Sequence, residues 1–232
     1  MITNLLWLIP ICIVAYFIGN INFSILLSKR RKKDIRALGS GNPGATNMLR
    51  TFGFKMALVT LFLDAFKAAA PVFAAYALFG GLGSNANASN AGVNAQIALY
   101  AVGFSVVIGH CYPVLYRFKG GKGVACMVGV FFVADPLVAF IAIVSATLFI
   151  LVVEYGAIAS FLFMSIVTIR QSLLSESLTV SLLIFALYLL AWFMHRKNIF
   201  RLLTGEESKA SILKKIKRRN LVKRQKLWLE EQ

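Results

Sequence analysis

The feature that most constrains this 232-residue chain is the grouping of its apolar residues into long, nearly uncharged blocks. A helix needs about 20 such residues to cross about 30 Å of hydrocarbon, and several blocks approach that length. The blocks run at roughly 4–27, 56–80, 96–115, 124–135, 137–153, 156–171 and 178–194. With 59% hydrophobic and 15% charged residues, the chain is more apolar than a soluble domain. We therefore predict an all-α integral membrane protein with seven transmembrane helices.

The block at 124–135 is too short to span alone, and Asp135-Pro136 after it predicts a helix break and turn. A count of five or six spans, with one re-entrant segment, is the alternative. The first 28 residues carry no charged side chain. Since the basic start of a cleavable signal peptide is missing, we expect this segment to stay as the first span.

The distribution of basic residues predicts the orientation. If seven spans alternate, of 25 Lys and Arg residues only Arg170 falls on the side of the N-terminus, while Lys67 lies within a span. Such a bias follows the positive-inside rule, so we expect the N-terminus outside and the C-terminus in the cytoplasm. Because membrane topology explains the formal charge of +16, we expect anionic lipids as partners rather than nucleic acid.

The segment "LGSGNPGATNMLR", residues 38–50, combines glycines with short polar side chains. Glycines permit tight backbone geometry and expose amide N–H groups, and an arginine adds a planar fork suited to phosphate. The residues expected to contribute are Ser40, Gly41, Asn42, Asn47 and Arg50. If a helix begins near Pro43, its free N–H groups would point at an anion. The alternative is a plain Gly/Asn/Ser turn that leads into a helix, but such a turn rarely needs so many donors plus an arginine. We favour an anion site.

The segment "YRFKGGKGVA", residues 116–125, crowds three cations and three glycines between two apolar blocks. It lacks the spacing of a Walker loop, yet glycine N–H groups and lysines would suit an oxyanion in the same way. The alternative is that the cations only anchor helix ends at the interface, which we favour for Arg117. The residues expected to bind substrate are Lys119, Gly120, Gly121, Lys122 and Gly123.

The segment "HRKNIFRLLTGEE", residues 195–207, follows the last apolar block. His195 and Asn198 share one face if the last helix continues, and Arg201 extends that face. A basic flank explains Arg196 and Lys197, but neither Asn198 nor the Gly-Glu pair. Polar groups elsewhere are few: His110 lies near a span end, and the Asp64–Lys67 pair, three residues apart, is expected to be architectural.

The motifs that are absent narrow the chemistry. The chain has no H-x-x-x-x-D pair, no G-x-S-x-G elbow, no nucleotide-binding fingerprint and no zinc-type cluster. Its three cysteines have no metal-ligand spacing, so we expect neither a metal, a cofactor nor a disulfide framework. A substrate that is already activated as a phosphate anhydride fits this pattern.

The three polar segments together resemble the bacterial acyl-phosphate:glycerol-3-phosphate acyltransferase family over about residues 1–207. The resemblance implies an inner-membrane enzyme that uses acyl phosphate to acylate the 1-hydroxyl of glycerol 3-phosphate, giving lysophosphatidic acid and phosphate for phospholipid synthesis. The residues that it assigns to catalysis are Ser40, Arg50, Lys119, His195 and Asn198, and those assigned to substrate binding are Gly41, Asn42, Asn47, His110, Gly120, Gly121, Lys122 and Gly123. Lys119 is slightly preferred over Lys122 for the leaving phosphate. Proton removal is assigned to the substrate's own phosphate, with His110 and His195 as rival bases.

Some positions depart from the family. "EYGAIASF", residues 154–161, stands where relatives usually have "RYVSLGSI", and Cys126 and Ala68 replace a usual Thr and Gly. The 208–232 tail carries nine Lys and Arg residues and is predicted to form a basic amphipathic helix on the inner leaflet. A transporter and a noncatalytic lipid-binding scaffold are the competing functions, and the oligomeric state stays open.

Overall fold

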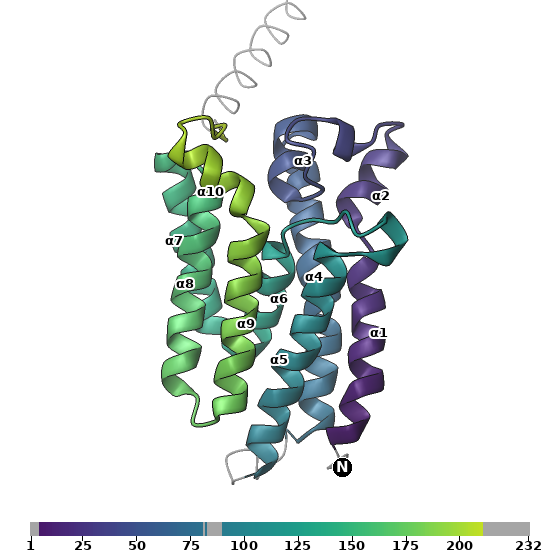
Figure 1. Ribbon diagram of the computed structural model, residues 1–232, viewed down its shortest axis with the longest axis vertical. Helices are drawn as coiled ribbons and strands as arrows, with labels where there is room; N and C mark the ends of the chain where they lie inside the picture. Colours follow the sequence, from purple (N-terminus) through teal and green to yellow (C-terminus); the bar gives the residue numbers. More distant parts are fainter. Residues whose placement is uncertain (1–4, 81, 83–89, 211–232) are drawn as a thin grey trace, which may run out of the picture.

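The computed structural model describes residues 5–80, 82 and 90–210, and all regular structure within these ranges is helical. Figure 1 shows the main helices lying side by side along one axis. In chain order the elements are η1 (Leu5–Trp7), α1 (Leu8–Asn20), α2 (Phe23–Arg30), η2 (Ile35–Ala37), α3 (Ala45–Phe52), α4 (Phe54–Leu78), α5 (Asn90–Cys111), η3 (Val114–Tyr116), α6 (Val124–Ala134), α7 (Pro136–Val153), α8 (Gly156–Leu174), α9 (Leu178–Met194) and α10 (Arg196–Leu203).

Five helical segments within the described ranges are long and apolar enough to cross a membrane. They are Leu5–Arg30, Phe54–Leu78, Gly92–Tyr116, Pro136–Val153 and Gly156–Leu174. The bent pair α9 and α10 makes a sixth if it counts as one span, and α6 is a shorter apolar helix. The prediction of an all-helical protein with several membrane spans is confirmed.

The first apolar block is divided into two helices, although Leu5–Arg30 together is long and apolar enough to be the first span that we expected. It breaks between α1 and α2, where the buried Asn22 caps α2 by accepting a hydrogen bond from the Ile25 N–H at 3.1 Å. The Ile21 carbonyl at this break accepts from Lys67 Nζ at 2.5 Å. Because these polar side chains satisfy the interrupted backbone, the chain can change direction inside an apolar bundle.

The last helix does not continue straight into the polar segment, which was the condition under which we expected His195 and Asn198 to share one face. α9 and α10 meet at an angle of 54°, with His195 between them. At this bend the Ala191 carbonyl accepts both the backbone N–H of His195, at 3.1 Å, and its ring Nδ1, at 2.8 Å. The predicted break at Asp135-Pro136 is confirmed, and Asp135 caps α7 through the Val138 N–H at 3.1 Å.

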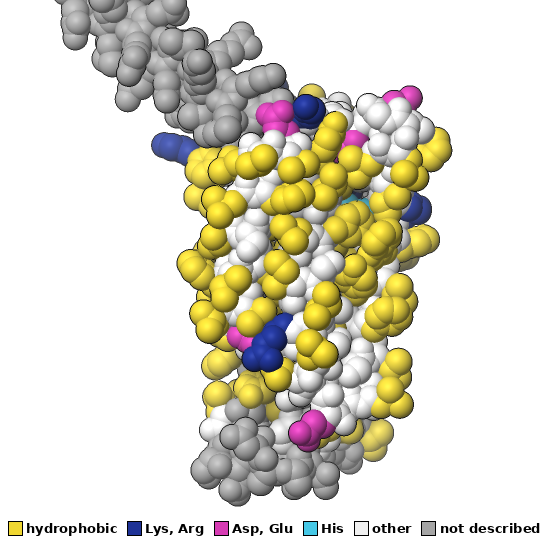
Figure 2. All heavy atoms as spheres, turned by 90° about the vertical axis from the view of Figure 1, so that its left-hand side faces the viewer, with side chains coloured by type: hydrophobic (Ala, Val, Ile, Leu, Met, Phe, Trp, Pro, Cys, Tyr) yellow, Lys and Arg dark blue, Asp and Glu magenta, His cyan; other side chains and the backbone are white. Residues whose placement is uncertain are grey.

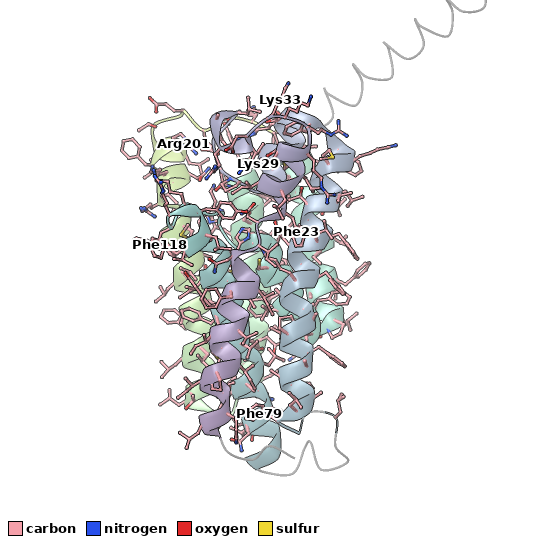
Figure 3. All side chains as sticks on the ribbon, turned by 90° about the vertical axis from the view of Figure 1, so that its right-hand side faces the viewer. Phe23, Lys29, Lys33, Phe79, Phe118 and Arg201 are labelled. Atoms are coloured by element: carbon pink, nitrogen blue, oxygen red, sulfur yellow. The ribbon has the colours of Figure 1, made fainter. Side chains whose placement is uncertain are left out.

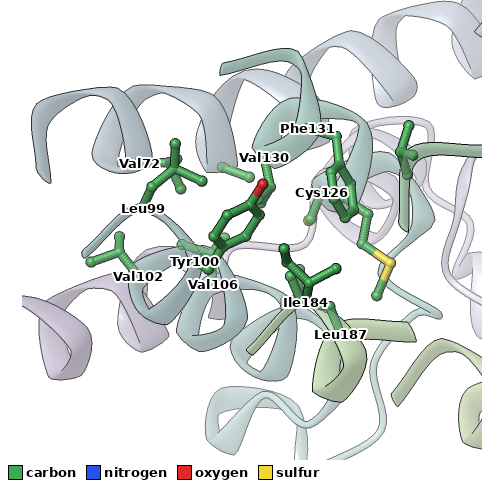
Figure 4. Packing of buried hydrophobic residues seen from close by; sticks show 14 of the residues in the cluster. Val72, Leu99, Tyr100, Val102, Val106, Cys126, Val130, Phe131, Ile184 and Leu187 are labelled. Atoms are coloured by element: carbon green, nitrogen blue, oxygen red, sulfur yellow. The ribbon is translucent and has the colours of Figure 1, made fainter. Parts of the chain in front are cut away.

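The core takes buried residues from α1 and from α4 to α9, and Figure 4 shows some of its aliphatic and aromatic side chains around Tyr100. Two helix pairs approach closely through glycine. A Cβ at Gly109 of α5 would lie 2.1 Å from the Tyr16 carbonyl oxygen of α1, and one at Gly129 of α6 would lie 2.0 Å from the Ala65 carbonyl oxygen of α4. Small residues permit such backbone contact between membrane helices.

The two ends of the bundle differ in composition. Figure 3 shows Lys29, Lys33 and Arg201 at one end, while Phe79 lies near the other. Figure 2 shows hydrophobic side chains over most of the face formed by α7 and α8. The polar segments around 38–44, 112–123 and 195–207 therefore meet at the basic end of an apolar bundle.

The segment that follows α10 packs back on the helices. The Ala210 N–H donates to the Glu154 carbonyl at 2.7 Å, and Lys209 Nζ lies 3.9 Å from the Glu154 carboxylate. Residues 208–210 are thus held against the membrane domain. The predicted basic helix falls mainly on residues 211–232, which lie outside the described residues.

We expect Gly129→Val to destabilise the bundle by about 1–3 kcal/mol, since its side chain has no room between α6 and α4. The melting temperature of the purified protein in detergent measures this effect. Ala74→Val, an exposed position on α4, is the control and should leave the melting temperature unchanged. Equal melting temperatures for the two variants would contradict the close α4–α6 contact.

Candidate functional site

A cavity of about 540 Å³ opens where the three polar segments meet. The 38–44 loop and α3 form one wall, the 118–123 loop with the first turn of α6 forms a second, and the α9–α10 bend with the first turn of α8 forms a third. Of the predicted residues, the lining includes Ser40, Gly41, Asn42, Asn47, Arg50, His110, Lys119, Gly120, Lys122, Gly123, His195 and Asn198. Gly121 lies next to this lining and packs on His110.

Asn47 holds the first loop, residues 38–44, in shape. Its Nδ2 donates to the Ile35 and Leu38 carbonyls at 3.1 and 2.9 Å, and its Oδ1 accepts from the Ser40 N–H at 3.0 Å. Because these bonds use both ends of the amide, Asn47 positions the loop rather than offering a donor to a ligand. Gly39 and Gly41 adopt φ of 56° and 71°, which favours glycine. The exposed Ser40 remains at the cavity lining.

Among the described residues of this wall, Arg50 carries a buried donor without a protein partner. Its Nη2 donates to the Ser208 carbonyl at 2.8 Å, but its buried Nε has no hydrogen-bond partner among the described residues. Burial lowers the pKa of Arg50 from its ordinary value, while the Glu207 carboxylate raises it. A buried guanidinium N–H without a partner is costly unless a ligand completes it.

Gly120 and Gly121 of the second loop, residues 118–123, pack against the end of α5. From the sequence we expected their N–H groups to be free to bind an anion instead. The Gly120 and Gly121 N–H groups already donate to the Cys111 and His110 carbonyls, at 3.2 and 3.1 Å. A Cβ at Gly120 would lie 2.0 Å from the His110 carbonyl oxygen, and one at Gly121 would lie 2.2 Å from His110 Nε2. The loop therefore folds tightly onto the end of α5.

Backbone N–H groups that could bind an anion occur directly after this loop, in the first turn of α6. Gly123, with φ of 81°, is the N-cap of α6, and Val124 and Ala125 of the first turn line the cavity. The first N–H groups of a helix have no intrahelical partner and attract anions. We did not predict this helix terminus as a donor site, although the change from glycines to an apolar block marks it in the sequence.

The two lysines of the second loop differ in placement. Lys119 is exposed at the cavity rim, whereas Lys122 points inward and its Nζ donates to Asn198 Oδ1. Burial lowers the pKa of Lys122 to about 8, because desolvation disfavours the ammonium, while the nearby Glu207 carboxylate raises that pKa. Arg117 lies outside the lining and is exposed. Lys122 is therefore the lysine that lies inside the cavity, and Lys119 is the one at its rim.

Below the cavity, Lys67 joins three elements. Its Nζ lies 2.7 Å from Asp64 Oδ1 on α4, 3.0 Å from His110 Nδ1 on α5 and 2.5 Å from the Ile21 carbonyl oxygen. The Asp64–Lys67 pair was expected to be architectural, and its contact with His110 links that pair to the cavity. Because the ammonium donates to Nδ1, neutral His110 carries its proton on Nε2.

The two histidines thus have opposite tautomers. A carbonyl can only accept, so His195 donates from Nδ1 to Ala191, and its Nε2 carries a lone pair when the ring is neutral. His195 Nε2 can take a proton, whereas His110 Nε2 can only donate one. Both side chains are buried, at 2% and 3% exposure.

Asp64, His110 and Cys126 are the one group of described residues whose ligand atoms lie close enough to hold a metal ion. The Lys67 ammonium already pairs with Asp64 Oδ1 and His110 Nδ1. A cation would have to displace this internal charge, so the donor set does not suit a metal.

We expect Gly121→Ala to lower the melting temperature, by an overpacking penalty of about 1–3 kcal/mol, because its Cβ would meet the fixed ring of His110. Gly44→Ala is the matched control from the same cavity region. A Cβ there would lie 3.0 Å from the movable Asn42 amide, and the backbone is extended. Thermal unfolding in detergent compares them; an equal loss for both variants would contradict the tight loop.

Comparison with known proteins places the chain in a family. A family model described as glycerol-3-phosphate acyltransferase matches residues 9–205. A glycerol-3-phosphate acyltransferase of Finegoldia magna is 38% identical over 208 residues, covering 89% of this chain and 98% of the relative. A second, of Agrobacterium fabrum, is 38% identical over 200 residues, covering 85% of this chain and 89% of the relative.

Two crystal structures of PlsY, an integral membrane glycerol 3-phosphate acyltransferase, have the same architecture. The glycerol 3-phosphate form matches with a TM-score of 0.77 at 33% identity, and the lysophosphatidic acid form with 0.74 at 32%. Each match covers 87% of this chain and 94% of the other. Because sequence, family model and fold agree over nearly the whole described domain, the chain belongs to the glycerol-3-phosphate acyltransferase family.

Proposed function

We propose that this protein transfers a fatty acyl group from an acyl phosphate to the 1-hydroxyl of glycerol 3-phosphate, giving lysophosphatidic acid and inorganic phosphate. The observation that carries the proposal is the cavity itself, which gathers Arg50, Lys119 and Lys122 around open N–H donors at the end of an apolar bundle. Both substrates bring a phosphate, and such a cavity suits two anionic groups.

We infer seven spans, with α1 and α2 counted once and α6 as the short fourth. The basic end, with Lys29, Lys33 and Arg201 (Figure 3), would then face the cytoplasm by the positive-inside rule, and the N-terminus would lie outside. The 11 residues of α6 extend only about 17 Å of the roughly 30 Å of hydrocarbon. A short fourth helix would let the cavity floor lie below the inner surface of the bacterial inner membrane.

The acyl chain would reach the cavity from the bilayer. Leu61 and Phe118 belong to the lining, and Phe118 is 60% exposed. An acyl phosphate would lie with its chain among such apolar groups and its phosphate toward Lys122 and Arg50. Ser40 and Lys119, at the more exposed side, would hold the phosphate of glycerol 3-phosphate.

The reaction needs an oxyanion stabiliser and a proton acceptor. The glycerol oxygen attacks the carbonyl carbon, and the bond from that carbon to the phosphate oxygen breaks with its electron pair leaving on inorganic phosphate. The free N–H groups at the start of α6 would stabilise the tetrahedral oxyanion, and Lys122 the departing phosphate. Loss of one such donor typically slows the reaction by about 10²–10³.

We assign proton removal to a substrate phosphate, whose second pKa is about 6 by analogy with phosphomonoesters. His110 is unsuited as a base because its Nδ1 accepts from Lys67. His195 is the remaining rival, since its Nε2 is the unprotonated nitrogen of the neutral ring.

The donor is tested with purified protein, labelled glycerol 3-phosphate and palmitoyl phosphate, with palmitoyl-CoA and palmitoyl-acyl carrier protein as matched donors. We expect labelled lysophosphatidic acid from palmitoyl phosphate alone, because the sequence has no nucleotide-binding fingerprint and no H-x-x-x-x-D pair. Formation of product only from a thioester donor would overturn the proposed donor.

The base is tested with His195→Ala and His110→Ala at saturating concentrations of both substrates. If a substrate phosphate accepts the proton, both variants keep measurable turnover, with kcat reduced by no more than about 10³. Abolished turnover in His195→Ala, with binding of both substrates intact by calorimetry, would instead make His195 the base.

A further inference from the structure

A continuous line of polar contacts runs from the second loop to the segment after α10. Lys122 Nζ donates to Asn198 Oδ1, and Asn198 Nδ2 donates to Glu207 Oε1 at 2.7 Å. The other carboxylate oxygen of Glu207 accepts from Arg201 Nε at 2.7 Å. Asn198 and Glu207 are buried, at 6% and 7% exposure, so water does not easily replace these partners.

The carboxylate fixes which way the Asn198 amide points. A carboxylate only accepts hydrogen bonds, so the amide turns its NH₂ toward Glu207 and its oxygen toward Lys122. The reverse orientation would set an NH₂ against an ammonium and an oxygen against a carboxylate. Asn198 therefore serves as an acceptor for Lys122, and both ends of its amide are used within the protein.

The charges around Lys122 come from three elements. Arg50 lies on α3, Arg201 on α10, and Glu207 in the segment after α10, while His195 faces the lysine from the α9–α10 bend. Burial lowers the pKa of Lys122 most, Arg201 and Arg50 lower it further, and Glu207 raises it. Among the described charged groups that act on Lys122, Glu207 is the one that favours its cationic form.

We propose that Glu207 is a positioning residue for acyl transfer, which orients Asn198 and thereby holds Lys122 as a cation aimed at the phosphate in the cavity. This inference rests on the proposed function. It assigns a role to Glu207, which ends the segment that a basic membrane flank only partly explained, and it makes the segment after α10 part of the site.

The test is the pH dependence of kcat/KM with palmitoyl phosphate, corrected for its spontaneous hydrolysis. Protonated Lys122 is the active form, so the rate falls as pH rises through its pKa of about 8. Glu207→Gln keeps the size of the side chain but removes its charge, which lowers the pKa of Lys122. We expect the alkaline limb to move to lower pH by about 1 unit.

Glu206→Gln is the matched control, because it removes the same charge from an adjacent, exposed side chain. It should leave both the profile and the melting temperature unchanged. Arg201→Gln removes a cation that opposes the Lys122 charge, so its alkaline limb should move to higher pH. A loss of folding alone cannot shift the alkaline limb to lower pH in Glu207→Gln and to higher pH in Arg201→Gln.

In the Lys122→Arg background the guanidinium does not titrate in this range, so the fall in rate near pH 8 should be absent, and Glu207→Gln should leave the pH profile there unchanged. If Glu207→Gln lowers kcat/KM equally at every pH and leaves the alkaline limb of the profile in place, the inference is wrong. It is also wrong if Glu207→Gln still shifts the profile in the Lys122→Arg background. If Glu207→Gln does not fold, Arg201→Gln tests the inference instead: a shift of its alkaline limb to higher pH supports it, and a shift to lower pH or no shift overturns it. Absence of turnover in the wild type would reject the proposed function instead.

Discussion

The contact on which the structure depends most is that of Lys67 with three neighbours in the middle of an apolar bundle. Its ammonium completes the broken backbone between α1 and α2, pairs with Asp64 on α4, and fixes His110 on α5. Charges in a membrane domain are stable only when paired in this way. Because His110 in turn supports the tightly folded Gly120–Gly121 turn, one buried cation connects helix packing to the shape of the cavity.

The site is built by backbone contacts more than by long side chains. Glycine brings α1 onto α5 and α6 onto α4, and the same residue type lets the second loop close over the end of α5. Asn47 and Asn198 use their amides within the protein, one to shape the first loop and one to aim Lys122. Among the described residues, the donors left for ligands include Arg50 Nε, Lys122 and the first turn of α6 on the inner side, and Ser40 and Lys119 on the more exposed side.

Much of this was readable from the sequence, for physical reasons. The blocks at 124–135, 137–153 and 178–194 match α6, α7 and α9 to within one residue at each end, because hydrocarbon thickness and proline restrict the alternatives. The block at 96–115 is displaced from α5, and the first block is divided into α1 and α2. The polar segments also named the residues that meet at the cavity. The sequence could not show that Gly120 and Gly121 N–H groups are already bonded, that α9 bends at His195, or that Glu207 turns back onto Asn198. Each of these depends on contacts between elements far apart in the chain, which no local pattern encodes.

We propose that one cavity, held in shape by Lys67 and Glu207, binds the phosphate of an activated acyl donor. A structure of the protein with an acyl phosphonate, which has a phosphate-like head but cannot transfer its acyl group, tests this most directly. We predict that the phosphonate lies within hydrogen-bonding distance of Arg50 Nε and Lys122 Nζ, with the Asn198–Glu207 contact intact. A phosphonate bound away from Arg50 and Lys122, for example at Lys29–Lys33 with the cavity empty, would contradict binding of the donor phosphate in this cavity.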